Sequence, residues 1–144
     1  MSVHPQARDI VEKIKYEWNM LQYCYKRMSN EQVNTDMYEQ NLFLEAFLLH
    51  ARVLKDFFIR DPSQDDVSAI HFFDDAAEWQ NIINILCPYL RQHQKRLNKY
   101  LAHLTYERIR EDKVWEVIAI FNELEYAWQQ FYALLPQERK EWFN

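Results

Sequence analysis

The segment RLNKYLAHLTYER, residues 96–108, combines an arginine and a histidine in a spacing that suits chemistry on a phosphate ester. On a helix, Arg96 and His103 lie two turns apart on one face, at the edge of a stripe of leucines. A histidine exchanges a proton readily near neutral pH, and a guanidinium holds a phosphate through paired hydrogen bonds. The alternative is a solvated basic helix face with no catalytic role.

A second group of polar residues interrupts the otherwise apolar segment 41–58, NLFLEAFLLHARVLKDFF. Helical spacing places Glu45, Arg52 and Asp56 on one face, where the two acids flank the arginine. His50 falls on a neighbouring apolar face. The functional interpretation is that these groups line a cleft. The structural interpretation is a charge network between packed helices, or a histidine hydrogen-bonded in the core.

The pair Arg96 and His103, with six residues between them, resembles the Rx4–6H signature of HEPN domains. These are small all-α domains, and many act as metal-independent endoribonucleases in toxin–antitoxin, CRISPR and abortive-infection systems. Their motif lies on a helix of a four- to five-helix bundle, and two copies usually meet across a homodimer. The resemblance implies that His103 is a general acid or base on the ribose 2′-hydroxyl, that Arg96 stabilises the charged transition state, and that Asn98 orients the phosphate. It also implies an RNA substrate, an antitoxin as a candidate partner, and no metal or cofactor.

The two quoted segments are also similar to a group of uncharacterised bacterial helical proteins of similar length. Those proteins carry an E-x-F-L-x-H-x-R-x-L-x-D-F-like helix followed by R-x-N-K-x-x-A-H-L-T. The similarity covers about half of the chain and brings no known activity with it. It suggests one polar constellation made of Glu45, His50, Arg52, Asp56, Arg96, Asn98 and His103. Further supporting candidates on the motif helix are Lys99 and Tyr106.

The composition indicates an all-α protein. The 144 residues include no glycine and only four prolines, whereas sheet proteins of this size normally need glycine in hairpin turns and bulges. The length fits a single helical-bundle domain, residues 1–144. A net charge of −5 argues against a broad basic surface for nucleic acid, but it leaves room for a local basic patch. P-loop and dinucleotide-binding signatures need glycine and are excluded.

Apolar residues recur at three- and four-residue steps, which predicts an up-and-down bundle of four to five helices, four of them long. A capping box at 29–32 or the segment 34–36 starts the second helix. Residues 62–75 read as a connector with one short turn at 67–72. The expected helices are 5–28, one ending near residue 60, one capped by Asp75, one that begins at Pro88 and carries the motif, and 112–135. Residues 137–144 are expected to be a short tail.

The second of these helices is apolar on nearly every side between residues 42 and 59. Such a helix is buried inside its own bundle or against a second copy, so we expect a central position and a homodimer. The main alternative to a ribonuclease is a non-catalytic interaction or binding protein whose polar cluster is structural. It is favoured by Leu97, where catalytic HEPN members often have a polar residue, by the acidic net charge, and by five tryptophans and nine tyrosines.

The remaining sequence features bear on metal binding and on the cellular compartment of the protein. Cys24 and Cys87 lie in apolar segments without ligand spacing, which indicates buried, reduced thiols. No Glu-x-x-His pair of the kind that di-iron bundles use occurs, so we expect no metal. The N-terminal segment has no signal-peptide core, and no apolar run is long enough to span a membrane. We therefore expect a cytoplasmic protein without a membrane partner.

Overall fold

The computed structural model describes residues 3–29, 36–102 and 116–144. In these ranges all regular structure is helical, which confirms the prediction of an all-α chain. The 3-10 helices are η1 Arg8–Ile10 and η2 Ala69–Phe72. The α-helices are α1 Val11–Ser29, α2 Met37–Ile59, α3 Ala76–Ile83, α4 Pro88–Gln92, α5 Gln94–Ala102, α7 Val117–Leu134 and α8 Gln137–Trp142.

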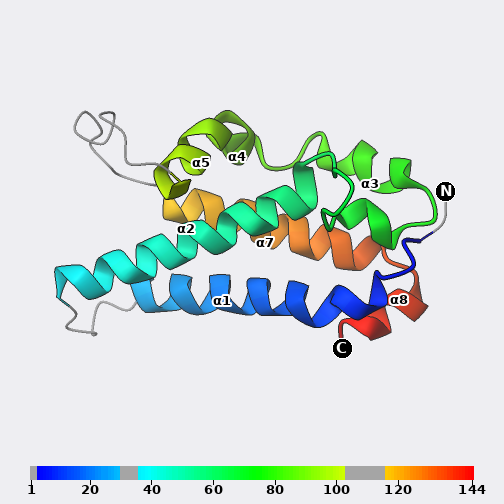
Figure 1. Cartoon of the computed structure of the whole chain (residues 1–144), viewed down its shortest axis with the longest axis horizontal. Coiled ribbons are helices and arrows are strands. Elements are labelled where there is room, and N and C mark those ends of the chain that lie inside the picture. Colours follow the sequence, from blue (N-terminus) through cyan, green and yellow to red (C-terminus); the bar gives the residue numbers. More distant parts are fainter. Residues whose placement is uncertain (1–2, 30–35, 103–115) are drawn as a thin grey trace.

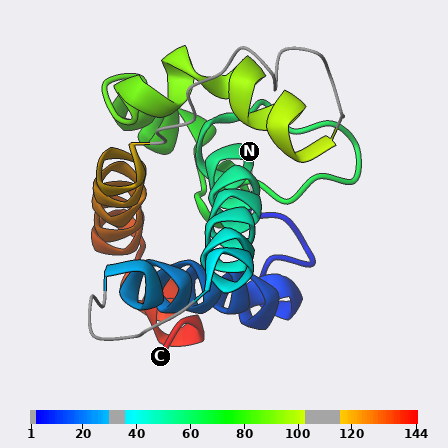
Figure 2. The ribbon, with the colours of Figure 1, turned by 90° about the vertical axis from the view of Figure 1, so that its left-hand side faces the viewer.

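Three long helices, α1, α2 and α7, form the body of the bundle (Figure 1). α1 and α2 run side by side in opposite directions, and α7 contacts both of them. Seen from the end, α2 and α7 lie between α1 and the short helices α3, α4 and α5 (Figure 2). The described part is therefore a helical bundle with three long helices; the fourth long helix that was expected falls partly on residues 103–115, outside the described ranges. None of the described helices combines the length and apolar character needed to cross a bilayer.

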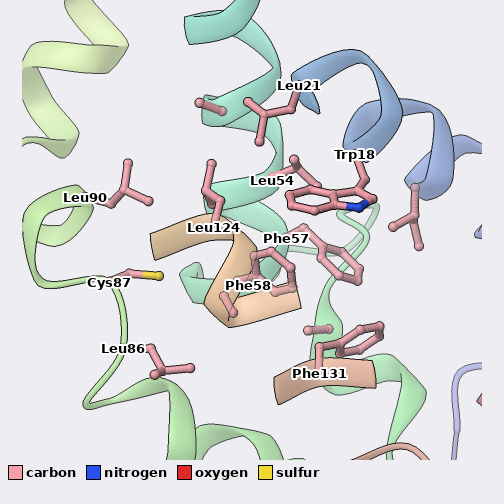
Figure 3. Packing of buried hydrophobic residues seen from close by; sticks show 14 of the residues in the cluster. Trp18, Leu21, Leu54, Phe57, Phe58, Leu86, Cys87, Leu90, Leu124 and Phe131 are labelled. Atoms are coloured by element: carbon pink, nitrogen blue, oxygen red, sulfur yellow. The ribbon is translucent and has the colours of Figure 1, made fainter. Parts of the chain in front are cut away.

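The core is built mainly from aromatic and leucine side chains on facing helices. Trp18 of α1 stacks on Phe121 and Trp128 of α7, with ring centroids 6.0 and 5.2 Å apart. Figure 3 shows Leu124 and Phe131 of α7 between α1 on one side and the segment with Leu86 and Leu90 on the other. Each fully buried leucine or phenylalanine contributes about 1.5–3 kcal/mol to folding, so this cluster holds the helices together.

Side-chain caps fix where the helices begin. Asp36 Oδ1 accepts from the Glu39 amide at 2.9 Å, so the second of the two proposed start signals for α2 is the one used. Asp75 Oδ1 accepts from the Ala77 amide at 3.0 Å and caps α3, as predicted. The expected turn in the connector is η2, capped by Ser68.

The motif helix differs from its prediction, because a break at His93 divides it into α4 and α5. At the break, Nε2 of Gln94 donates to the Arg91 carbonyl at 3.4 Å and satisfies a backbone acceptor. The start of α4 is held from outside: both carboxylate oxygens of Glu123 accept backbone amides, those of Tyr89 at 2.9 Å and Leu90 at 3.0 Å. The helix that begins at Pro88 is thus the short α4, and Arg96 and Asn98 of the motif lie on α5.

The C-terminal segment is also not the simple tail that was expected. Residues 137–142 form α8, and Phe143 behind it is buried in the core against Phe72 and Phe131. Burial of the Phe143 ring removes apolar surface from water and so lowers the free energy of the folded chain. This explains why the C-terminal segment packs back against the core. Arg139, which is buried, ties α8 to the connector through hydrogen bonds described below.

Within its own chain α2 is covered on most sides but not on all of them, so the choice between burial inside the bundle and burial against a second copy stays a prediction. Its neighbours α1, α5 and α7 cover three sides and leave a fourth open. Leu42, Leu49 and Val53 are 64%, 47% and 41% exposed on that side. A helix in this bundle is covered only where a neighbour reaches it.

Candidate functional site

His50 of α2 faces α1 and is tied to it. Its Nδ1 lies 2.5 Å from Oε2 of Glu17, and the ring of Tyr16 stands edge-on to the imidazole with centroids 6.0 Å apart. His50 is buried, and the Glu17 side chain is mostly covered. The structural interpretation of His50, a histidine hydrogen-bonded between packed helices, describes this arrangement.

Lys55 is the residue that the sequence reasoning missed. It is 1% exposed, and its Nζ lies 3.0 Å from Oδ1 of Asp56 and donates to Oδ1 of Asn98 at 3.5 Å. A buried ammonium needs such partners, because water cannot solvate it. Lys55 lies on a buried stripe of α2 that also contains Leu48, Ala51 and Phe58. Their helical spacing can be read from the sequence. Of the predicted site residues, the structure brings Asp56 and Asn98 together through this lysine.

The predicted constellation is divided between two sides of α2. His50 and Lys55 are five residues apart, which on an α-helix is about 140° around the axis. One side chain therefore meets Glu17 on α1 and the other meets Asn98 on α5. The described structure does not join His50 and Asn98 into one cluster.

Glu45 and Arg52 lie on the open side of α2, which we call the outer face. It consists of Tyr38, Leu42, Glu45, Leu49, Arg52 and Val53, which are exposed except for the half-buried Arg52. Of the predicted shared face, Glu45 and Arg52 lie on the outer face, whereas Asp56 is half-buried beside Lys55 and lines the adjoining groove. Four large apolar side chains accompany the charges, and a contiguous exposed apolar surface of this kind is typical of an interaction site.

A groove of about 300 Å³ continues the outer face toward α1. Its floor is apolar, with Ile14, Leu54 and Phe57, and Val53 belongs both to its wall and to the outer face. Charged residues form the rim: Lys13, Glu17, Asp56, Arg60 and Asp66. An apolar floor with a few polar groups at the edge is the usual character of a binding site.

The charges on the rim are partly fixed by neighbours. Asp56 lies 3.9 Å from Nη1 of Arg60 as well as 3.0 Å from Lys55. The hydroxyl and then the amide of Ser63 donate to Asp66, and these hydrogen bonds lower the pKa of its carboxyl group. Asp66 therefore stays anionic even in mild acid. The groove offers an apolar floor between fixed charges of both signs.

The motif residues of α5 are only partly described. Arg96 and Asn98 are half-buried and Lys99 is exposed, and both Arg96 and Lys99 have interactions of their own. His103 and Tyr106 lie outside the described residues. Leu97 is buried in the core, which gives it a packing role within the motif.

The two thiols have no nucleophilic character in this environment. Burial raises the pKa of Cys24, and burial followed by the charge of Glu123 raises the pKa of Cys87 to about 12. Both cysteines are free and buried, as predicted. Protonated, covered thiols neither attack substrates nor ligate metals. Within the described ranges no three histidine, cysteine or acidic side chains gather as a metal site.

Comparison with known proteins adds no relative: no family model matches the chain, and neither a curated protein nor a solved structure does. The features of this chain that bear on function are therefore the geometry of α2, of the groove and of α5.

Proposed function

We propose that this protein is a non-catalytic helical interaction protein, and that the outer face of α2 with the adjoining groove is its recognition surface. The observation that carries this proposal is the row of exposed apolar side chains on a central helix. Tyr38, Leu42, Leu49 and Val53 follow one another at steps of four, seven and four residues. Leaving such a stripe in water is unfavourable unless a partner covers it.

The buried polar residues of α2 support the same function. His50 is engaged with Glu17, and Lys55 with Asp56 and Asn98, so these groups act as contacts between helices. A stripe with i, i+4, i+11, i+15 spacing stays on one side of α2 and fits a partner helix laid along it. Glu45 and Arg52 would set the orientation of that helix, since charges at an interface mainly give specificity.

Site-specific photocrosslinking tests this function. With the photoreactive amino acid p-benzoylphenylalanine in place of Leu49, we expect a discrete crosslinked product in cells that produce the protein. The control position is Ile85, which is 81% exposed but lies outside α2. The product should disappear when Leu42→Glu is added, because a charge there cannot be buried in the contact. Equal crosslinking at positions 49 and 85 would show that the outer face is ordinary surface.

A metal-independent HEPN-type endoribonuclease is the second candidate, and a separate observation favours it. α5 carries Lys95, Arg96 and Lys99 and no acidic residue, although the chain as a whole is acidic. Local positive charge of this kind attracts a phosphate backbone. In this function Arg96 and His103 act across a homodimer with a HEPN-like arrangement, and Asn98, held by Lys55, orients the phosphate. Such an enzyme would be a toxin or a component of a defence system, with an antitoxin as its partner.

The ribonuclease function predicts RNA cleavage by the purified protein in EDTA. His103→Ala should lower the rate at least ~100-fold, the usual effect of removing a general acid or base. His93→Ala, a change of another histidine in the same region, is the matched control and should retain the rate. Equal residual cleavage by wild type and His103→Ala would rule this function out.

A further inference from the structure

We propose that the partner of the outer face is a second copy of this chain, with the two α2 helices antiparallel across a two-fold axis near Leu49. In this arrangement Glu45 of each copy pairs with Arg52 of the other. The inference rests on the proposed interaction function, because it names the partner for the same surface. It is carried by the charges of the outer face and by their order around the helix.

Glu45 and Arg52 have opposite charges but no partner among the described residues of their own chain. Other charged residues of α2 are paired, for example Asp56 with Lys55. Glu45 and Arg52 cannot pair with each other inside one chain, since seven residues separate them by about 10 Å along the helix. Within the described part of the chain, each therefore presents an uncompensated charge beside the apolar stripe.

The order of residues around the helix fits an antiparallel pairing. At about 100° per residue, Glu45 and Arg52 lie along one edge of the outer face, and Leu42 and Val53 lie along the other, with Leu49 between. A two-fold axis perpendicular to the helices brings each edge against the same edge of the second copy. The axis between Leu48 and Leu49 then sets Glu45 level with Arg52 of the second copy. Leu42 comes within one turn of Val53 of the second copy, so apolar meets apolar.

A parallel pairing lacks these matches. It would put Glu45 level with Glu45 of the second copy, and Arg52 about 10 Å away along the axis. The charges would then remain unpaired on both copies. The antiparallel arrangement is the one that satisfies all four charges at once.

The same arrangement accounts for the groove. Tyr38 is 76% exposed near the beginning of α2, and antiparallel pairing sets it level with Arg60 of the second copy, at the rim of that copy's groove. Exposed tyrosines that enter a partner's pocket are frequent anchors of protein interfaces. The groove would thus receive an aromatic ring at each end of the dimer.

Sedimentation of the purified full chain across a wide micromolar range tests the pairing. We expect wild type to be dimeric, and Glu45→Arg and Arg52→Glu each to weaken the dimer about tenfold or more, since two ion pairs are replaced by like charges. The double variant E45R/R52E restores both pairs with the charges exchanged and should recover the wild-type constant. Thermal melting of each variant checks that the fold is intact, which matters most for Arg52→Glu because Arg52 is half-buried. A monomeric wild type, or a double variant no better than the single ones, overturns the proposal.

Cysteine crosslinking checks the direction of the helices independently of charge. Leu49→Cys lies near the axis and should join two copies through a short bismaleimide, whereas Leu42→Cys should not, because its two copies are about 20 Å apart in this arrangement. Crosslinking at both positions would indicate a parallel pair and overturn the proposal. Photocrosslinking at position 49 to a different protein, with the purified chain monomeric, would also overturn it while leaving the interaction function in place. The interaction function itself fails only if position 49 behaves like position 85.

Discussion

At the scale of single residues, the buried charges of α2 explain why a helix with so many apolar residues also contains a histidine and a lysine. Both meet a complementary group on another helix: His50 meets Glu17 of α1, and Lys55 meets Asn98 of α5. Buried polar groups of this kind contribute little net stability when paired, but they are costly when one partner is lost. They therefore favour one relative placement of the helices over others.

This asymmetry predicts unequal effects at Lys55 and its acidic partner. Asp56→Ala removes the carboxylate and leaves a buried ammonium with Asn98 as its remaining ligand. It should lower the free energy of unfolding by about 2–3 kcal/mol, as for other buried charged groups without a partner. Lys55→Met replaces the buried ammonium with an apolar side chain of similar size and should cost less, since the Asp56 carboxylate left behind is partly exposed and keeps Arg60 as a neighbour.

Urea denaturation of both variants measures the difference. Asn41→Ala, at an exposed position of the same helix, is the control and should change the free energy of unfolding by less than about 0.5 kcal/mol. If Lys55→Met proves more destabilising than Asp56→Ala, the lysine would be contributing through its stem rather than through its charge.

At the scale of helices, the sequence predicted what depends on local spacing. The caps Asp36 and Asp75, the end of α2 before Pro62 and the short turn at η2 are all local, and each is found. The break at His93 was not predictable, because α4 is held by Glu123, which lies more than thirty residues away in the sequence. The local sequence determines where a helix can form. Contacts with residues far away in the sequence determine whether two neighbouring helical segments form one continuous helix.

The outer face of α2 shows the same limit of prediction from local spacing. Spacing alone placed Glu45 and Arg52 on one face of α2, and the structure agrees. Spacing could not reveal that this face is open, because that depends on which neighbours pack beside α2. For Lys55, spacing indicates its place on the buried stripe but not its partner Asn98 on α5, which explains why a charge is tolerated there. Spacing therefore predicts which residues share a face of a helix, but it does not predict what packs against that face.

At the scale of the whole molecule, the last residues of the chain join elements that are far apart in sequence. Arg139 Nη1 donates to the Phe72 carbonyl at 2.8 Å, and Nη2 lies 2.8 Å from Oδ1 of Asp74. The same turn carries Phe143 into the aromatic cluster around Phe131. α8 thus connects the segment that follows α2 to the end of α7. It does so at the aromatic cluster around Phe131, on the side of α2 that faces the core.

We therefore expect Arg139→Ala to destabilise the whole fold by about 1–3 kcal/mol, since the Phe72 carbonyl is left buried without its donor. Gln137→Ala, which is exposed on the same short helix, is the matched control and should have little effect. Chemical denaturation followed by tryptophan fluorescence measures both, because Trp79 and Trp128 report on the core that α8 covers. If the two variants unfold at the same denaturant concentration, Arg139 is dispensable and α8 is held by its other contacts, among them those of Trp142 and Phe143 with Phe72. A single cooperative transition at lower denaturant for Arg139→Ala would show that α8 belongs to the same folding unit as the helix that presents the outer face.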